Sequence, residues 1–334
     1  MVAASALFAL TACSAAPGNG STKTAESLTL YNGQHESTTE LLVSDFTKAT
    51  GITVKVRSGE DPELANQIVQ EGSASPADVF YSENSPALTL LSEQGKLAPV
   101  STTTKKQIPA KFSSPNGDWV GIAGRAVVLA YNPEKLATAQ VPASILDVGG
   151  PTWSGKVGIA PSGADFQAIV AGVIKSTGVS AATTWLEGLK RAGQVYPGNS
   201  AIMQAVNRGE IPAGIIYHYY WFRDQAESGA NSANVKMHYF GNQDPGAFLS
   251  ISGAGVLKSS THQEAAQKLV QFLSGTKGQT ALADSDDFEY PLNASVPANP
   301  KLKPLAELEL PDTVLADVGN GKQVIKLLQQ VGLL

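Results

Sequence analysis

Strand-like and helix-like segments alternate along this 334-residue chain from residue 27 onward, and this alternation constrains the fold more than any other feature. Residues 27–31, 52–56 and 77–81 are short apolar runs typical of strands. Residues 36–50 and 63–70, which separate these runs, carry apolar side chains at helical spacing. A strand–helix–strand–helix–strand order predicts a parallel sheet covered by helices.

Two longer apolar segments indicate where the chain passes between two lobes. Residues 119–131 are almost continuously apolar, broken only by Gly124 and Arg125, and residues 247–257 form a similar run. A second β/α block follows the first of these segments. Two α/β lobes joined by more than one crossing describe a hinged clamshell that closes on a ligand in its cleft.

The crossings divide the chain into three expected parts. We expect residues 1–26 to be a signal or lipoprotein anchor with a flexible tether. The first lobe is expected to comprise residues 27–126 with about 250–300. The second lobe is expected to comprise residues 127–249 with about 301–334.

The single cysteine, Cys13, indicates export. It follows a short apolar stretch of mostly small side chains and precedes a flexible polar tether. The residues Leu10-Thr11-Ala12-Cys13 resemble the lipobox of bacterial lipoproteins, in which the cysteine is lipidated. Residues 1–12 lack the Lys or Arg that usually opens an export signal, which an upstream start codon would explain. We therefore expect an exported lipoprotein at the cell surface or in the periplasm, tethered to the membrane through Cys13.

Composition restricts the classes of partner. Acidic residues outnumber basic ones by 29 to 24, and no cluster of Lys and Arg stands out, which argues against nucleic acid as a partner. After residue 13 no apolar run is long enough to span a membrane, so the predicted membrane contact is the lipid anchor alone. Aromatic residues make up only 7% of the chain, so a local concentration of them carries weight.

Residues 217–221 hold three tyrosines, one histidine and one tryptophan. They follow residues 210–216, a run that is typical of a buried strand, and the ends of such strands are where open α/β sheets bind ligands. Ionising a phenol at neutral pH costs about 4 kcal/mol, so a highly charged metal ion is the obvious partner for phenolates. The alternative is an aromatic core or a platform on which a sugar stacks.

Two polar residues of the first lobe are expected at the matching edge. His35 follows the first predicted strand and Glu83 follows the third, and these strand ends share one edge of a doubly wound sheet. Taken singly, each is more simply interpreted as a solvated surface group. Together with the tyrosines they offer nitrogen and oxygen donors suited to a small trivalent cation, and the lack of a thiolate argues against a soft metal.

A third group of residues suggests an anion site. Residues 161–165 lead into a predicted helix, where backbone N–H groups and small side chains allow an anion to approach closely. Asn199, ahead of another helical stretch, is either a cap or a ligand. Asp165 is best interpreted as an N-cap, because its charge would oppose an anion if it turned inward.

Several motifs resemble those of the bacterial ferric-ion-binding proteins, the "bacterial transferrins" of ABC-type iron uptake, over nearly all of residues 28–332. The motifs that carry the resemblance are Tyr31-Asn32-Gly33-Gln34-His35, Ser75-Pro76-Ala77-Asp78-Val79-Phe80-Tyr81-Ser82-Glu83, Tyr219-Tyr220-Trp221, Asp244-Pro245-Gly246-Ala247, Ser252-Gly253-Ala254, Val256-Leu257-Lys258-Ser259-Ser260 and Glu289-Tyr290-Pro291-Leu292-Asn293. The resemblance implies an α/β fold of the two-lobe, periplasmic-binding-protein-like clamshell type, with a hinge of crossing strands.

The resemblance also implies a ligand set. The metal ligands would be His35, Glu83, Tyr219 and Tyr220, with Fe³⁺ as the cargo. A synergistic anion (phosphate, carbonate or citrate) would be held by Ser162, Gly163, Ala164 and Asn199.

This chain departs from the family pattern at three places, one of which is Asn84, where the family has a glutamine after the ligand glutamate. Tyr217 stands where the family has an asparagine, and we expect it to be an additional metal ligand or to replace the anion. Asp165 lies in the loop that is expected to hold the anion. Trp221 is expected to pack in the interior, and His218 is expected to face away from the site.

The leading functional prediction is an extracytoplasmic, monomeric binding protein that captures ferric ion and delivers it to an ABC permease. A binding protein of the same fold for a polyamine, thiamine or phosphorylated sugar is the alternative, with the aromatic residues stacking on the ligand. An enzyme using Glu36 and Glu83 is disfavoured, because no nucleophile elbow, zinc-protease motif or nucleotide loop occurs in a plausible context.

Overall fold

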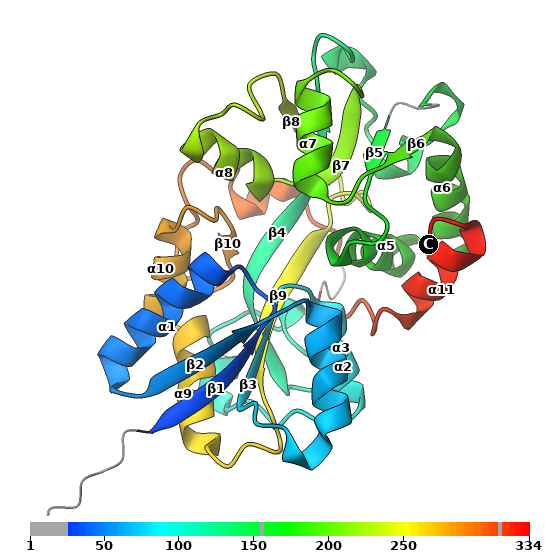
Figure 1. Cartoon of the computed structure of the whole chain (residues 1–334). Helices are drawn as coiled ribbons and strands as arrows, with labels where there is room; N and C mark the ends of the chain where they lie inside the picture. Colours follow the sequence, from blue (N-terminus) through cyan, green and yellow to red (C-terminus); the bar gives the residue numbers. More distant parts are fainter. Residues whose placement is uncertain (1–25, 154–156, 313–315) are drawn as a thin grey trace, which may run out of the picture.

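The computed structural model describes residues 26–153, 157–312 and 316–334 (Figure 1). The predicted lipidation site, Cys13, lies outside these ranges, as does nearly all of the predicted anchor. Within them, no helix combines the length and apolar character needed to cross a membrane.

One mixed sheet of ten strands runs through the described chain. Its strands are β1 Ser27–Asn32, β2 Thr53–Ser58, β3 Val79–Ser82, β4 Trp119–Tyr131, β5 Val157–Ile159, β6 Gly193–Val195, β7 Ala213–Tyr217, β8 Lys236–Tyr239, β9 Leu249–Val256 and β10 Tyr290–Pro291. The strand order is β2-β1-β3-β9-β4-β7-β5-β6, with β8 and β10 also pairing with β4. The β1, β2 and β3 strands are parallel to one another, as are β5, β6 and β7.

Helices cover both halves of this sheet (Figure 1). They are α1 Glu36–Thr50, α2 Asp61–Glu71, α3 Ser85–Glu93, α4 Thr102–Lys105, α5 Ala164–Thr177, α6 Val179–Ala192, α7 Asn199–Asn207, α8 Tyr219–Glu227, α9 Gln263–Ser274, α10 Thr276–Asp284 and α11 Lys322–Val331. Local chemistry explains several ends: Pro62 occupies the first turn of α2, and Gly51 ends α1 in the left-handed conformation at φ 75°.

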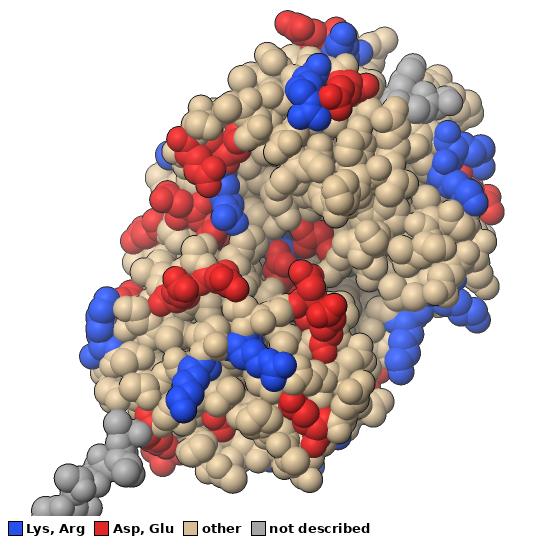
Figure 2. Space-filling model, viewed as in Figure 1, with Lys and Arg blue, Asp and Glu red and all other residues tan. Residues whose placement is uncertain are grey.

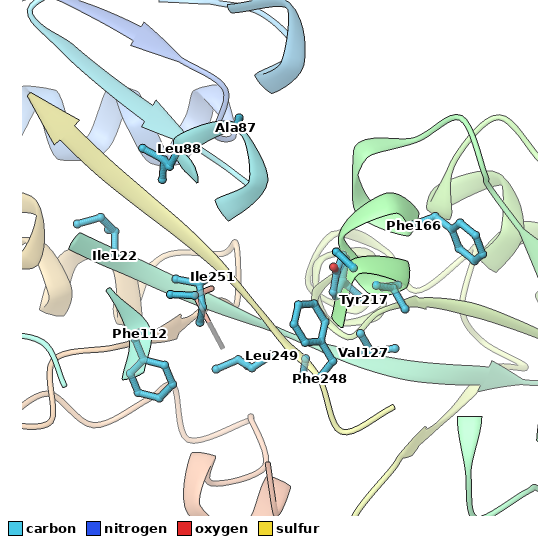
Figure 3. Close-up of a cluster of buried hydrophobic side chains, with 14 of the residues drawn as sticks. Ala87, Leu88, Phe112, Ile122, Val127, Phe166, Tyr217, Phe248, Leu249 and Ile251 are labelled. Carbon is cyan, nitrogen blue, oxygen red and sulfur yellow. The ribbon is translucent and has the colours of Figure 1, made fainter. Parts of the chain in front are cut away.

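Two antiparallel strands, β4 and β9, connect the lobes. The first half of β4 pairs with β9 and β10, and its second half pairs with β7 and β8. All 13 residues of β4 are buried, which explains why the sequence is almost continuously apolar there. In Figure 3, Ile122, Leu249 and Ile251 lie along this crossing, and Tyr217 lies beside Val127 at the second-lobe end.

The predicted fold class is therefore confirmed: a mixed α/β, two-lobe clamshell joined by crossing strands. The C-terminal helix α11 packs on α5 and α6 of the second lobe. Its buried side chains Val324, Leu327, Leu328 and Val331 recur at the spacing of one helical face.

Candidate functional site

Side chains from both lobes meet in the hollow between them, where acidic and basic atoms are visible together (Figure 2). In the first lobe, His35 follows β1 and Glu83 follows β3. In the second lobe, Tyr219 follows β7 and Asp165 lies in the first turn of α5, shortly after β5. Each group lies beyond the carboxyl end of a parallel strand, the usual location of ligand sites in such sheets.

His35 is held by the loop between β1 and α1. The Asn32 side chain closes this loop by donating to the Gln34 carbonyl at 2.8 Å and accepting from the Gln34 N–H at 3.1 Å. The Gly33 N–H donates to the carbonyl of Tyr81 at 2.7 Å. These bonds fix His35 at the mouth of the cleft, with its side chain 15% exposed.

Glu83 is held by a buried carboxylate beneath its loop. Asp61, at the start of α2, accepts the backbone N–H groups of Glu83 at 3.0 Å and Asn84 at 2.8 Å. Burial raises the pKa of Asp61 to about 7. A side chain at Gly33 would place its Cβ 1.8 Å from an Asp61 carboxylate oxygen, so the missing side chain brings the His35 and Glu83 loops together.

This close approach gives a stability prediction. Gly33→Ala is expected to lower the free energy of unfolding by about 1–3 kcal/mol, because Asp61 must move or the loop must shift. Urea unfolding measures this change. Gly150→Ala is the control, because Gly150 does not need a positive φ and its added Cβ would meet the Asp147 carbonyl oxygen no closer than 3.3 Å. Equal stability of the two variants would contradict the proposed packing of the two loops.

The aromatic cluster divides into residues that face the cleft and residues that pack. The Tyr219 hydroxyl donates to Glu83 Oε1 at 3.4 Å across the cleft, and the Tyr220 hydroxyl donates to Asp165 Oδ2 at 3.2 Å. Their rings stack with centroids 4.2 Å apart. Trp221 packs inside the second lobe, with its indole N–H bonded to a backbone carbonyl.

His218 and Tyr217 lie deeper in the molecule. His218 is fully buried, and its Nδ1 accepts the backbone N–H of Ala126 at 3.2 Å. Tyr217 is also fully buried; its hydroxyl donates to the Asp165 carbonyl at 3.3 Å, and its ring lies under the Arg125 guanidinium at 4.9 Å. Tyr217 therefore packs against a buried cation.

That cation, Arg125, is the main residue of the site that sequence reasoning missed. It lies on β4 with its side chain fully buried, and its Nη1 contacts Glu83 Oε1 at 2.5 Å and Asp165 Oδ1 at 3.0 Å. Its Nη2 donates to the Glu83 carbonyl, to Asn84 Oδ1 at 2.7 Å and to Ser250 Oγ at 3.1 Å. One guanidinium thus joins carboxylates from both lobes. A lone charge inside the apolar run of residues 119–131 was the signal that could have identified it.

Asp165 does not cap α5, and the interpretation of it as an N-cap is wrong. The N-cap residue is Gly163, which has no side chain to cap with. Asp165 turns inward instead because Arg125 compensates its charge, and its Oδ2 also accepts from Asn199 Nδ2 at 2.7 Å.

The remaining residues predicted to bind an anion form the turn before α5. Ser162 is exposed, and its carbonyl accepts from Gln167 at 3.2 Å. The Gly163 N–H donates to the Ala160 carbonyl at 3.0 Å, and Ala164 begins the helix. Asn199 is the member of the predicted set that bonds a carboxylate, and that carboxylate belongs to Asp165.

Burial sets the protonation of the candidate ligands. It raises the pKa of the Tyr219 and Tyr220 phenols above their ordinary value, and the Asp165 and Glu83 carboxylates raise it further. Burial also lowers the pKa of His35 to about 3, assisted by Arg223 and Arg125. At neutral pH the phenols therefore keep their protons, whereas His35 is neutral and free to ligate.

Glu289 is a second residue that sequence reasoning did not place in the site. It precedes β10, is fully buried, and lies with its Oε1 3.9 Å from His35 Nδ1 and 3.9 Å from Arg125 Nε. Burial raises its pKa to about 8. Single donor atoms of His35, Glu83 and Glu289 lie within 4.8 Å of one another, which is compact enough to surround a metal ion.

Comparison with known proteins places this geometry in a family. The family model described as "Bacterial extracellular solute-binding protein" matches residues 32–280. The chain belongs to this family. The predicted extracytoplasmic location follows from this family. Its members bind solutes for transport and are not enzymes, which was also predicted.

The similarity of this solute-binding protein to its relatives covers nearly its whole length. It is 47% identical to an "Fe(3+)-binding periplasmic protein" of Serratia marcescens, with 92% of this chain and 91% of the relative covered. Iron-bound HitA from Pseudomonas aeruginosa is 44% identical, with a TM-score of 0.86 over 92% of this chain and 99% of HitA. A Trichodesmium protein, IdiA (FutA), in complex with iron and citrate ligands is 31% identical, with a TM-score of 0.80 and the same coverage. The predicted resemblance to bacterial ferric-ion-binding proteins is confirmed.

Proposed function

We propose that this solute-binding protein captures ferric ion between its lobes and delivers it to an ABC permease. The proposed ligands are His35, Glu83, Asp165, Tyr219 and Tyr220. One observation carries the proposal: the hydroxyls of the two stacked tyrosines already point at carboxylates from opposite sides of the cleft. The names of the iron-binding relatives support it.

The donor chemistry favours a small, highly charged cation. Two phenols, two carboxylates and one neutral imidazole supply hard oxygen donors and one nitrogen, and no thiolate is present among them. A trivalent ion offsets the cost of ionising the two buried phenols, which a weakly charged ligand does not. Because ligands come from both lobes, iron binding stabilises the closed arrangement.

Asp165 is proposed to take the place of an external anion. With iron bound, the three charges of the ferric ion and the one charge of Arg125 balance two carboxylates and two phenolates. Such a site is neutral without any added anion, which matters because buried net charge is costly. The Asn199 amide, predicted to hold an anion, bonds the Asp165 carboxylate and supports this assignment.

Arg125 is proposed to remain as the fixed counter-charge of the site. It bonds Glu83 and Asp165 while the phenols are protonated, so neither carboxylate is buried without a partner. Tyr217 is proposed to support Arg125 from below rather than to bind iron, in keeping with its position under the guanidinium.

Delivery of iron to the permease is proposed to depend on the lipid anchor. A lipid on Cys13 would tether the protein beside an ABC permease, and a polar tether of this kind allows the lobes to reach it. We propose that the protein works as a monomer, since both halves of the site come from one chain.

Iron loading is expected to release about two protons per ion from the phenols, one from each, and the raised pKa of the buried Glu83 carboxyl adds to this release. Affinity is therefore expected to fall about 100-fold for each pH unit of acidification, because protons compete with iron for Tyr219 and Tyr220 over the whole range below their raised pKa values. His35 adds no proton near neutrality, because its pKa is lowered to about 3.

Proton release can be measured by adding ferric nitrilotriacetate to weakly buffered protein and titrating the acid produced. A variant with both Tyr219→Phe and Tyr220→Phe corrects for protons released by hydrolysis of the chelate, and a titration of free nitrilotriacetate corrects for the proton that the released chelator takes up. Equal proton release from the wild type and this double variant would rule out phenolate ligation.

A further inference from the structure

We propose that Gln34 and Glu289 hold His35 in the tautomer that presents Nε2, and not Nδ1, to the metal. This inference rests on the proposed function in that it takes His35 as an iron ligand. In this role Gln34 and Glu289 are positioning residues that act through His35, and neither belongs to the proposed ligand set.

The orientation of the Gln34 side-chain amide is fixed by a backbone donor. Gln34 Oε1 accepts the backbone N–H of His35 at 2.7 Å, and a backbone N–H can only donate. The atom at that position is therefore the amide oxygen rather than the amide nitrogen. The amide nitrogen, Nε2, donates on its other side to Glu289 Oε2 at 3.1 Å.

The imidazole must conform to this arrangement. His35 Nδ1 lies 2.6 Å from the same Gln34 oxygen, which only accepts hydrogen bonds, so Nδ1 must carry the proton. In a neutral imidazole the other nitrogen, Nε2, then has the free lone pair that a metal requires. Outer partners of ligating histidines fix ring orientation and raise ligand basicity in this way.

The position of Glu289 in the fold allows it to accept a hydrogen bond from the Gln34 side-chain amide. It is fully buried, 255 residues from Gln34 in sequence, and comes directly after Phe288, whose φ of 53° is rare for a bulky residue. A strained backbone of this kind persists where the surroundings over-determine it, often near functional sites. The strained residue brings the Glu289 side chain beneath the His35 loop.

His218 provides an internal reference for this argument. Its Nδ1 accepts the backbone N–H of Ala126, so its proton must lie on Nε2. His35 and His218 should therefore be opposite tautomers within one protein. The two protonation patterns are set by different partners: a side-chain oxygen for His35 and a backbone N–H for His218.

Long-range ¹H–¹⁵N correlation of iron-free protein labelled at histidine tests the inference directly. The expected result is an Nδ1–H tautomer for His35 beside an Nε2–H tautomer for His218. An Nε2–H tautomer for His35 would overturn the inference. Because no iron is present, this outcome is separate from failure of the proposed function, which would appear as no uptake of ferric nitrilotriacetate.

Variants extend the test to binding. Gln34→Leu is expected to give a mixture of His35 tautomers and an iron affinity lowered by about 10–100-fold, as typical for the loss of an outer partner. Gln263→Leu is the matched control, because the Gln263 side chain at the start of α9 donates to the backbone carbonyls of Leu257 and Ser260, away from His35. An unchanged tautomer and affinity in Gln34→Leu would contradict the proposal.

A charge swap separates positioning from packing. Gln34→Glu alone puts two carboxyl groups side by side and is expected to weaken iron binding. Combining it with Glu289→Gln restores one amide and one carboxylate in the reverse order, so His35 Nδ1–H keeps an acceptor and affinity should recover to within a few-fold of the wild type. If the folded double variant does not recover its iron affinity, the proposed positioning of His35 by Gln34 and Glu289 is contradicted.

Discussion

Tyr220→Phe is expected to remove most of the visible colour of the iron-loaded protein and to lower iron affinity by more than about 100-fold. This loss exceeds the 10–100-fold typical of an outer partner, because a charged ligand is removed. The fold should persist, since phenylalanine keeps the ring stacked on Tyr219 at a centroid distance of 4.2 Å. Absorption spectra during titration with ferric nitrilotriacetate measure both effects.

The control for this prediction is Tyr196→Phe. Tyr196 also donates its hydroxyl to a neighbouring side chain, at 3.2 Å, and its charged neighbours are Arg208 and Glu210 rather than the carboxylates of the site. Iron-phenolate coordination gives the charge-transfer colour, so the control should retain it. Colour and affinity retained in Tyr220→Phe would refute the assignment of Tyr220 as a ligand.

Asp165→Ala is expected to convert a site that needs no external anion into one that does. In phosphate-free buffer the variant should bind iron about 100-fold or more weakly, because it loses a ligand and leaves Arg125 and Asn199 without their shared carboxylate. Millimolar phosphate should restore part of the affinity of the variant, since both freed groups donate hydrogen bonds to anions. The wild type should show no such response.

The matched control is Asp317→Ala, which removes an exposed carboxylate paired with Lys175 at 3.0 Å. Surface pairs of this kind contribute little, so iron binding should be unchanged with and without phosphate. A wild type that itself requires phosphate, or a variant indifferent to it, would show that Asp165 does not replace the anion.

The fold could be predicted from the sequence because its signals are local. Apolar periodicity identified the strands that precede His35, Glu83 and Tyr219. The rule that ligands bind at the carboxyl ends of parallel strands then predicted that these residues share one cleft. The almost continuously apolar run of β4 indicated the crossing between lobes.

The electrostatic part of the site could not be predicted in the same way. Arg125 meets Glu83 and Asp165 from 42 and 40 residues away, and no periodicity connects such positions. Asp165 was misinterpreted because its local sequence suits a helix cap, whereas a distant guanidinium decides its direction. Glu289 reaches the His35 loop only through the tertiary fold.

The ferric site itself is tested most directly by an iron-edge anomalous difference map from a crystal of the iron-loaded protein grown without phosphate or citrate. We expect one peak in the cleft between the lobes, bonded to the phenolate oxygens of Tyr219 and Tyr220 and to the carboxylates of Glu83 and Asp165. A peak away from both phenolate oxygens, or a cleft in which those tyrosines still donate to Glu83 and Asp165, would contradict it.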